Sequence, residues 1–457
     1  MSWELFCFPD WKLLHIGFTY NYILLNLKKG SSKIHSLHDR LIPLVSSKPL
    51  NTWVKSTIHA VRHASAGLNT SNQHNIARCI DKEREALLRF KQGILDRCGL
   101  LTSWGSQQGN RDCCNWPGVR CNNQTGHIIE LDLHGNGFLN FNDYDCHLEG
   151  KLSDSLGELK HLKYLDLSSN NFLDQPIPAI IGSLSYLEHL NLSCAHFAGE
   201  IPKQLGNLSH LTFLDLSYNL HLYANSLQWL FHLTLLKDLD LSNTYLLETN
   251  DWFQAINSLP FLRTLHLDLC LLPSTIPTPF SFINSSSNLA IFSLANNFLN
   301  DSLIFEWSYS NCMLFTYLDL SYNQLKGRFS NAIGYKRSLT YLDLSHNTLD
   351  RFIPRTIRNL KSLSYLQLSD NSFSGPIPNE IGNLQSLIYL KLSNNLLSNS
   401  ISDALHNLKS LAYLDLSHNS FSSSIPSFLG NMLSLTSLDI SHNLLIGVIP
   451  VYLIIAL

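Results

Sequence analysis

The chain has 457 residues, of which 15% are charged, and its formal net charge is −3. One compact core rarely serves a chain of this length, which favours either several domains or an elongated array of repeats. The nearly balanced charge, with no basic stripe along the sequence, argues against a nucleic-acid partner.

Residues 1–78 form a leader that differs from the rest of the chain. Residues 1–27 are apolar and aromatic-rich, but Glu4, Asp10 and Lys12 interrupt them, so no continuous signal-peptide core is present. Residues 28–78 are polar and aperiodic, which predicts loop or poor order. The leader is either an unusual signal or signal anchor, or a segment that is not native. No apolar run of about 18 residues occurs, so no membrane span is predicted.

Residues 79–127 predict a small capping domain in front of the repeats. Asp81 and Glu85, with the apolar residues that follow as far as Leu95, predict an amphipathic helix. Four cysteines lie in this segment and predict two disulfides and an oxidising compartment: Cys79, Cys113, Cys114 and Cys121.

Cys113 and Cys114 are adjacent, which favours a different partner for each. We favour the pairs Cys79–Cys113 and Cys114–Cys121, although spacing alone leaves other pairings open. Cys98 and Cys146 form either a further bridge or two free buried thiols. The cysteines lack the CxxC spacing of zinc sites, so no metal is predicted.

Residues 128–457 contain thirteen copies of the pattern LxxLxLxxN, and the last six copies begin 24 residues apart. This period predicts an α/β-type solenoid: a curved leucine-rich-repeat superhelix with a parallel sheet on its concave side. At about 4.8 Å per strand the concave path measures roughly 60 Å, which suits a protein or an extended peptide. The copies begin at Ile128, Leu162, Leu187, Leu211, Leu236, Leu262, Leu289, Phe315, Leu339, Leu363, Leu387, Leu411 and Leu435.

The ninth position of the pattern is Asn in ten of the thirteen copies, and the exceptions are Ala195, Thr244 and Cys270. A buried Asn can donate to and accept from backbone groups of its own and a neighbouring repeat. An Ile-Pro step recurs in the second half of many repeats, as at Pro354 and Pro378.

The cap carries the strings C-x-x-x-E-R-E-A-L-L-x-F-K, L-T-S-W, D-C-C-N-W-P-G-V-R-C and T-G-H-I-I-E-L-D-L. With the repeats, these strings resemble plant leucine-rich-repeat receptors, and especially receptor-like proteins that detect microbial products. The resemblance extends from Cys79 to Pro450. It implies a helical, disulfide-stapled N-terminal cap, and a second strand after the Gly-x-Ile-Pro step. It also implies that this chain is a truncated product or fragment, because family members usually continue beyond such a point.

Six N-x-[ST] sequons support passage through the secretory pathway. Asn69 lies in the leader, and the others are Asn123, Asn191, Asn207, Asn284 and Asn300. Asn191 falls at an outward position of its strand, where a glycan would block part of the concave face.

Two sets of outward residues are candidates for ligand contact on the concave face. The first is a tyrosine column, which is either a ligand platform or a stack dictated by the repeat: Tyr317, Tyr341, Tyr365, Tyr389 and Tyr413. The second set lies in the region of the third to seventh repeats, which departs from the repeat pattern, so the scaffold does not dictate it: His189, Phe213, Tyr218, Lys237, Asp238, Arg263 and His266.

No nucleophile elbow, zinc-protease motif, phosphate-binding loop or kinase glycine loop is present, so neither an enzyme nor a cofactor is predicted. The resemblance implies the ligand-binding ectodomain of a receptor-like protein at the plant plasma membrane or in the apoplast, with a role in defence or development. The implied partners are a protein or peptide ligand on the concave face and a co-receptor kinase. The alternatives are a secreted protein similar to polygalacturonase inhibitors, or a non-functional receptor fragment.

Overall fold

The structure is a computed structural model that describes residues 78–105, 107, 111–135, 146–274, 288–300, 304 and 315–449. All the described elements belong to one compact unit, Ala77–Leu457. Almost all of the leader lies outside the described residues, as do Asn69, Asn284 and residues 450–457.

The cap begins with the predicted helix. Helix α4 buries Ala86, Leu87 and Phe90, and Phe90 packs against Trp104 with a ring separation of 6.3 Å. Trp104 stacks in turn on Trp116 at 5.2 Å, which gives the cap a small aromatic core. The elements of the cap and its junction are α4 (Asp81–Gln92), β1 (Ile94–Asp96), η1 (Cys113–Asn115), β2 (Val119–Cys121) and β4 (Leu148–Gly150).

Three disulfides hold the cap together. They join Cys79 to Cys113, Cys114 to Cys121, and Cys98 to Cys146. The first two are the favoured pairs, and the third answers the open question about Cys98 and Cys146 in favour of a bridge. Cys194 and Cys270 are buried, and neither forms a disulfide among the described residues.

Buried Glu83 fastens the cap to the first repeat. Its carboxylate accepts a hydrogen bond from the backbone N–H of Ile128 at 2.7 Å, and its other oxygen lies 2.7 Å from Nδ1 of His127. Ser155 adds a bond from its Oγ to the carbonyl of Ala86 at 2.8 Å. Helix α4 therefore closes the apolar end of the array through specific polar contacts as well as apolar ones.

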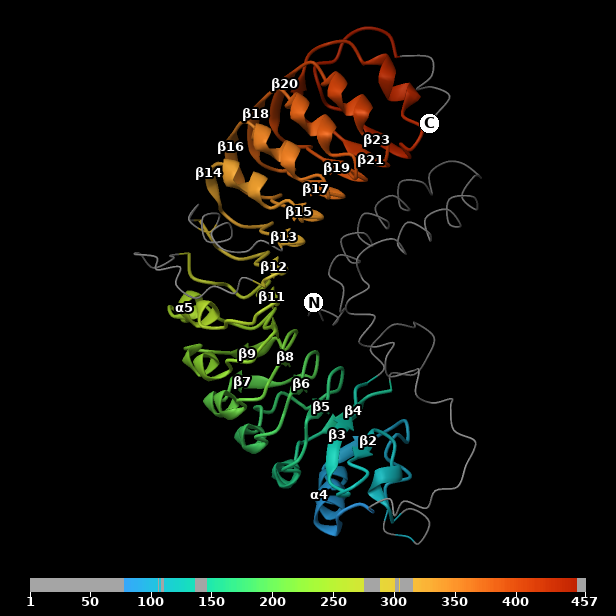
Figure 1. The fold of residues 1–457 in the computed structure, drawn as a ribbon, viewed down its shortest axis with the longest axis vertical. Helices are drawn as coiled ribbons and strands as arrows, with labels where there is room; N and C mark the ends of the chain where they lie inside the picture. The colour runs from blue at the N-terminus through green and yellow to red at the C-terminus, as the bar shows by residue number, and fades with distance from the viewer. Residues whose placement is uncertain are drawn as a thin grey trace, which may run out of the picture. The chain divides into compact units, whose positions relative to one another are not determined.

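The repeats build one fourteen-stranded sheet, in which β2 and β3 are antiparallel and all later neighbours are parallel. Figure 1 shows these strands along one margin of the array and the short helices along the other. After β2 the strands are β3 (Ile128–Asp132), β5 (Tyr164–Asp166), β6 (His189–Asn191), β8 (Phe213–Asp215), β10 (Asp238–Asp240), β11 (Thr264–His266), β12 (Ile291–Ser293), β13 (Tyr317–Asp319), β15 (Tyr341–Asp343), β17 (Tyr365–Gln367), β19 (Tyr389–Lys391), β21 (Tyr413–Asp415) and β23 (Ser437–Asp439).

The leucines of the pattern form the core. In the ninth repeat Leu339, Leu342 and Leu344 are all 0% exposed. Each buried leucine contributes roughly 2 kcal/mol through removal of its surface from water. Successive strand residues face opposite ways, so Tyr341 and Asp343 lie on the other side of the sheet. The predicted leucine-rich-repeat solenoid with a stapled helical cap is confirmed.

The ninth-position asparagines link consecutive repeats. Asn347 donates through Nδ2 to the carbonyls of Leu320 and Leu344 at 2.9 and 3.1 Å, while its Oδ1 accepts from the N–H of Leu325 at 3.0 Å. The same set of bonds recurs at Asn371 and Asn395. A column of buried amides thereby satisfies backbone groups that the leucine core cannot.

Further strands lie beside the main sheet, as the Gly-x-Ile-Pro resemblance implies. Five of them pair in parallel: β14 (Lys326–Arg328), β16 (Thr348–Arg351), β18 (Ser372–Gly375), β20 (Leu396–Asn399) and β22 (Ser420–Phe421). Two more, β7 (Ala198–Glu200) and β9 (His221–Tyr223), form a separate pair in the earlier repeats.

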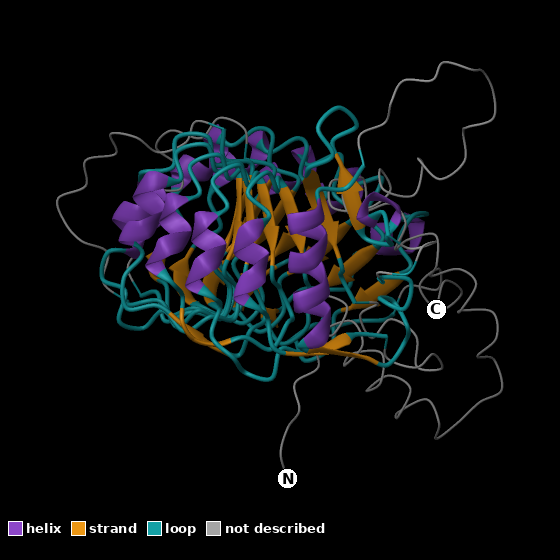
Figure 2. Ribbon diagram, turned by 90° about the horizontal axis from the view of Figure 1, so that it is seen from below, coloured by secondary structure: helices purple, strands orange, loops and turns teal. Residues whose placement is uncertain are grey.

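Short helices complete most repeats and stand in a row in Figure 2. Proline precedes many of them; Pro354 and Pro378, for example, lie directly before η7 and η8. None of the helices that the structure describes is long and apolar enough to cross a bilayer. The short helices that complete the repeats are η2 (Asp154–Glu158), η3 (Ala179–Ser183), η4 (Lys203–Asn207), η5 (Gln228–His232), α5 (Trp252–Asn257), η6 (Asn331–Tyr335), η7 (Arg355–Asn359), η8 (Asn379–Asn383), η9 (Asp403–Asn407) and η10 (Ser427–Asn431).

Candidate ligand-binding face

The outward side of the main sheet, here called the sheet face, has the second position of each repeat at its edge and is formed by the third, fifth and eighth positions. In the ninth repeat these are Tyr341, Asp343 and His346. Strand register aligns each position with its equivalent in the next repeat, as Tyr341 with Tyr365. Each position therefore forms a column along the sheet, and a departure from the repeat pattern changes one step of a column.

The tyrosine column is a continuous stack. Successive rings from Tyr317 to Tyr413 have centroids 4.3–4.4 Å apart and lie within 7–9° of parallel. The hydroxyl of Tyr365 donates to Oε1 of Gln367 at 2.6 Å. Because each inner ring covers the faces of its neighbours, a ligand would meet ring edges and not open faces. The geometry supports the stack over the platform.

The same column continues in the early repeats through His189. Its ring stacks between Tyr164 and Phe213 at 4.2 and 4.1 Å. Burial lowers the pKa of His189 to about 4, so the ring is neutral near pH 7. Its Nε2 has no hydrogen-bond partner among the residues that the structure describes. His189 and Phe213 therefore act first as packing residues.

A cluster of carboxylates lies beside this stack, in the fourth to sixth repeats. Asp215 and Asp240 are register partners on β8 and β10, and His266 is the next residue along the column. The pKa of Asp215 is raised to about 7, first by burial and then by the charge of neighbouring Asp240, while hydrogen bonds from Ser217 oppose the rise. Burial also raises the pKa of Asp240, and His266 opposes this.

Basic side chains border the cluster. Lys237 and Arg263 are exposed and lie on neighbouring repeats, since the N–H of Arg263 donates to the carbonyl of Lys237 at 2.7 Å. Burial raises the pKa of Asp238, and hydrogen bonding to Thr264 and the charges of these two cations oppose the rise. The structure thus brings Lys237, Asp238 and Arg263 together.

Tyr218 completes this group from the eighth position. Its backbone is left-handed, with φ of 56°. Burial raises its pKa, and the charges of Asp240 and Asp268 raise it further. His266 Nδ1 lies 3.9 Å from Oδ2 of Asp268. We call Tyr218, Lys237, Asp238, Asp240, Arg263 and His266 the mixed-charge segment.

Two sets of residues important to the face were not singled out from sequence. Asp215 and Asp240 match the usual Asp of the fifth position, and what the structure adds is that they lie on adjacent strands and that the pKa of each is raised. Gln367 and Lys391 replace that Asp in two consecutive, otherwise regular repeats. This replacement of the usual Asp could have been recognised from the sequence.

One group of potential metal ligands lies at the start of the sheet face. Donor atoms of Asp132, His134 and Asp166 lie within 4.8 Å of one another. Hydrogen bonding already occupies them, because Asp166 accepts from Oγ of Ser168 at 2.6 Å and from Nδ2 of Asn191 at 3.0 Å. His134 Nδ1 lies 2.5 Å from Asp132 Oδ1. The arrangement is a polar network of the repeat pattern and needs no ion.

The sequons differ in their surroundings. Asn123, Asn207 and Asn300 are exposed. Asn191 is half-buried: its Nδ2 donates to Asp166 at 3.0 Å and its Oδ1 accepts from Oγ of Ser193 at 2.8 Å. Its amide therefore has a structural task that a glycan would disrupt.

A stapled cap, a leucine core and an exposed polar sheet face define a leucine-rich-repeat recognition module. The chain belongs to the leucine-rich-repeat proteins: the family described as "Leucine-rich repeat region" matches residues 138–289 and 297–444, and "Leucine rich repeat N-terminal domain" matches residues 80–122. These assignments cover the cap and both segments of the array.

Its relatives include plant receptor-like proteins. Receptor-like protein EIX1 of Solanum lycopersicum is 37% identical over 56% of this chain, and Receptor-like protein EIX2 of the same plant is 38% identical over 58%. The matched region spans about a quarter of the length of these relatives, 25% and 26%. A solved structure of PEPR1 with AtPEP1 is 28% identical, with a TM-score of 0.64, over 82% of this chain and 53% of that one.

Proposed function

We propose that this chain is the ligand-recognition part of a plant cell-surface receptor-like protein, which binds a protein or peptide on the sheet face. The observation that carries the proposal is the mixed-charge segment. Here exposed Lys237 and Arg263, which the repeat pattern does not require, border the adjacent carboxylates of buried Asp215 and half-buried Asp240. Residues that the scaffold does not require are the ones free to serve recognition.

The names of similar proteins support this proposal. The relatives EIX1 and EIX2 are named receptor-like proteins, and the solved structure of PEPR1 holds a second component, AtPEP1. Binding to such a face requires no catalysis. The proposal includes a partner kinase, because a recognition surface alone passes no signal to the cell interior.

The test uses a random peptide library displayed on phage and selected on the immobilised, purified chain. Arg263→Glu reverses an exposed charge of the mixed-charge segment, and we expect bound phage to fall about tenfold, as at an interface hot spot. Lys361→Glu is the matched control, because Lys361 is also exposed but lies before its repeat pattern begins, away from the sheet face. Equal binding by Arg263→Glu and the unaltered chain would contradict the proposed location of the site.

A further inference from the structure

The fifth and seventh positions of most repeats form a fixed hydrogen-bonded pair. Asp343 Oδ1 accepts from both the N–H and the Oγ of Ser345, at 2.9 and 2.6 Å. The same two bonds join Asp319 to Ser321 and Asp415 to Ser417. The carboxylate therefore satisfies a serine hydroxyl that is itself buried.

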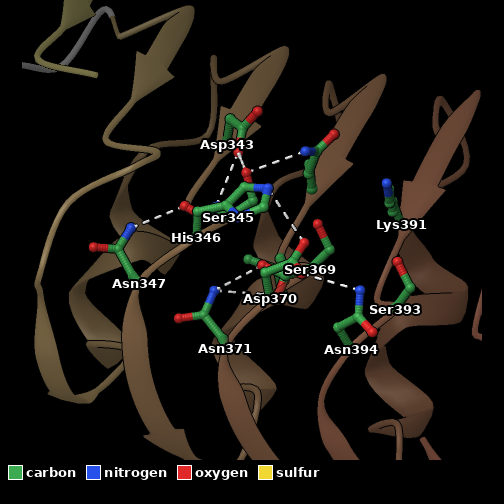
Figure 3. Close-up of polar contacts among 12 residues, drawn as sticks. Asp343, Ser345, His346, Asn347, Ser369, Asp370, Asn371, Lys391, Ser393 and Asn394 are labelled. Atoms are coloured by element: carbon green, nitrogen blue, oxygen red, sulfur yellow. Dashed lines mark hydrogen bonds and ion pairs between the residues drawn. The ribbon is translucent and has the colours of Figure 1, made fainter. Parts of the chain in front are cut away.

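Two consecutive repeats break this pairing, as Figure 3 shows. Gln367 takes the fifth position of the tenth repeat and turns to the previous repeat, where its Nε2 donates to Oγ of Ser345 at 3.1 Å. Lys391 takes the fifth position of the eleventh repeat, and its Nζ lies 3.8 Å from Oδ2 of Asp415. Neither side chain bonds to the serine two residues further on.

The two serines concerned are left without an acceptor. Ser369 and Ser393 are 0% and 2% exposed, and neither Oγ has a hydrogen-bond partner among the described residues. A buried hydroxyl without a partner is unfavourable and rare in folded proteins, so each one calls for an explanation. These two hydroxyls lie in adjacent repeats and near Lys391, so hydrogen-bond acceptors are missing at a single place on the sheet.

We propose that Ser369, Ser393 and Lys391 form a subsite for a carboxylate of the ligand, an inference that rests on the proposed binding role of the sheet face. The ligand carboxylate supplies the acceptor that Asp343 and Asp415 supply in the flanking repeats. Lys391 adds the positive charge, and its long 3.8 Å separation from Asp415 leaves the ammonium able to turn toward a ligand.

The nearby acidic side chains accept hydrogen bonds from other donors, so they leave the hydroxyls of Ser369 and Ser393 without an acceptor in the described part of the chain. Asp370 accepts from Nδ2 of Asn394 at 3.0 Å and lies 3.3 Å from Nε2 of His346. Asp415 accepts from both donors of Ser417. Figure 3 shows Asp370 and Asn394 close to Ser369 and Ser393, so donors and paired acids frame the subsite.

The position of the subsite also limits the form of the ligand. Six strand steps separate Asp240 on β10 from Lys391 on β19 in the sheet order. At about 4.8 Å per step the path is about 29 Å, which an extended peptide covers with about nine residues. A peptide ligand that contacts both the mixed-charge segment and this subsite therefore has at least that length when extended.

The test compares Lys391→Asp with the unaltered chain and with Lys361→Asp, an exposed control with the same charge change. Lys391→Asp restores the repeat pattern and gives Ser393 an acceptor, so the variant is expected to melt no lower than the unaltered chain. The probe is a synthetic random peptide pool captured on each immobilised protein and sequenced by mass spectrometry. We expect capture of carboxylate-bearing peptides to fall about tenfold in Lys391→Asp alone, as for a charge-assisted hydrogen bond.

A comparison of pools with free and amidated C-termini tests for a chain-end carboxylate. A comparison of pools with and without Asp and Glu tests for a side-chain carboxylate, and either source supports the subsite. Ser393→Ala is a second variant, which removes the unsatisfied hydroxyl and should lose the same peptides without loss of stability. Identical peptides captured by all variants would overturn the subsite, while loss in Arg263→Glu would still uphold the proposed function. No capture by the unaltered chain would reject both.

Discussion

Asn347 shows how a single side chain fixes the distance between repeats. It bonds to Leu320, Leu325 and Leu344, which belong to two repeats. Asn347→Ala leaves these backbone groups unpaired, so we expect a loss of about 3 kcal/mol in the free energy of unfolding. Chemical denaturation measures the loss, and Asn383→Ala, at an exposed position of η8, is the control. A loss equal to that of the control would mean that water molecules replace the hydrogen bonds of the asparagine side chain.

Asp215 makes a pH-dependent contribution to stability. Its pKa rises from 3.8 to about 7 in the folded chain, first through burial and then through Asp240. The fold therefore favours the protonated form, and this contribution is complete below the unfolded pKa and is lost as pH rises toward 7. We expect Asp215→Asn to lessen the fall in stability across that range. Unfolding curves at several pH values test it, and parallel profiles for both proteins would contradict it.

Asn191 is expected to lack a glycan although it lies in a sequon. Its amide bonds to Asp166 and Ser193 on the sheet face, whereas Asn123 and Asn207 are exposed. Glycopeptide mass spectrometry of the chain secreted from plant cells should find glycans at Asn123 and Asn207 and an unmodified Asn191. Full occupancy at Asn191 would show that this part of the sheet face is not available to ligands.

At the scale of elements, the cap disulfides should differ in their effect on stability. The Cys98–Cys146 bridge closes a sequence separation of 48 residues, and Cys114–Cys121 closes one of 7. Loop-closure entropy assigns them about 4 and about 2 kcal/mol, respectively. Paired Cys→Ala replacements should therefore destabilise the cap more for the longer loop, as measured by chemical denaturation. The reverse order would mean that local contacts, and not chain entropy, determine the effect.

The elements themselves were largely predictable from sequence, because each leucine of the pattern has one available place, in the core. The cap helix followed from apolar spacing, and the two favoured disulfide pairs are present, although cysteine spacing alone left other pairings open. The side-chain contacts between repeats could not be predicted in this way. The turn of Gln367 toward Ser345, and the burial of Asp215 against Asp240, depend on which residue the next strand places alongside. A pattern within one repeat holds no information about that neighbour.

At the scale of the whole array, neighbouring repeats are joined by different sets of contacts in the earlier and the later half. The later repeats combine an unbroken asparagine ladder, the stack from Tyr317 to Tyr413 and a five-stranded side sheet. The earlier repeats contain Ala195, Thr244 and Cys270 at ladder positions, and among their described residues the side pairing consists of β7–β9 and isolated bridges. Because a solenoid's stability is the sum of its repeats and their interfaces, these differences act locally.

We therefore expect slower native-state hydrogen exchange in β15, β17 and β19 than in β6, β8 and β10. Exchange reports local opening, and strands joined by more buried hydrogen bonds open at a higher free energy. In Asn371→Ala, the ladder breaks between the repeats of β15 and β17, and the protection of these two strands should fall toward that of the earlier strands while β8 is unchanged. Equal protection throughout the unaltered chain would show instead that the array opens as one cooperative unit, with the leucine core outweighing the ladder.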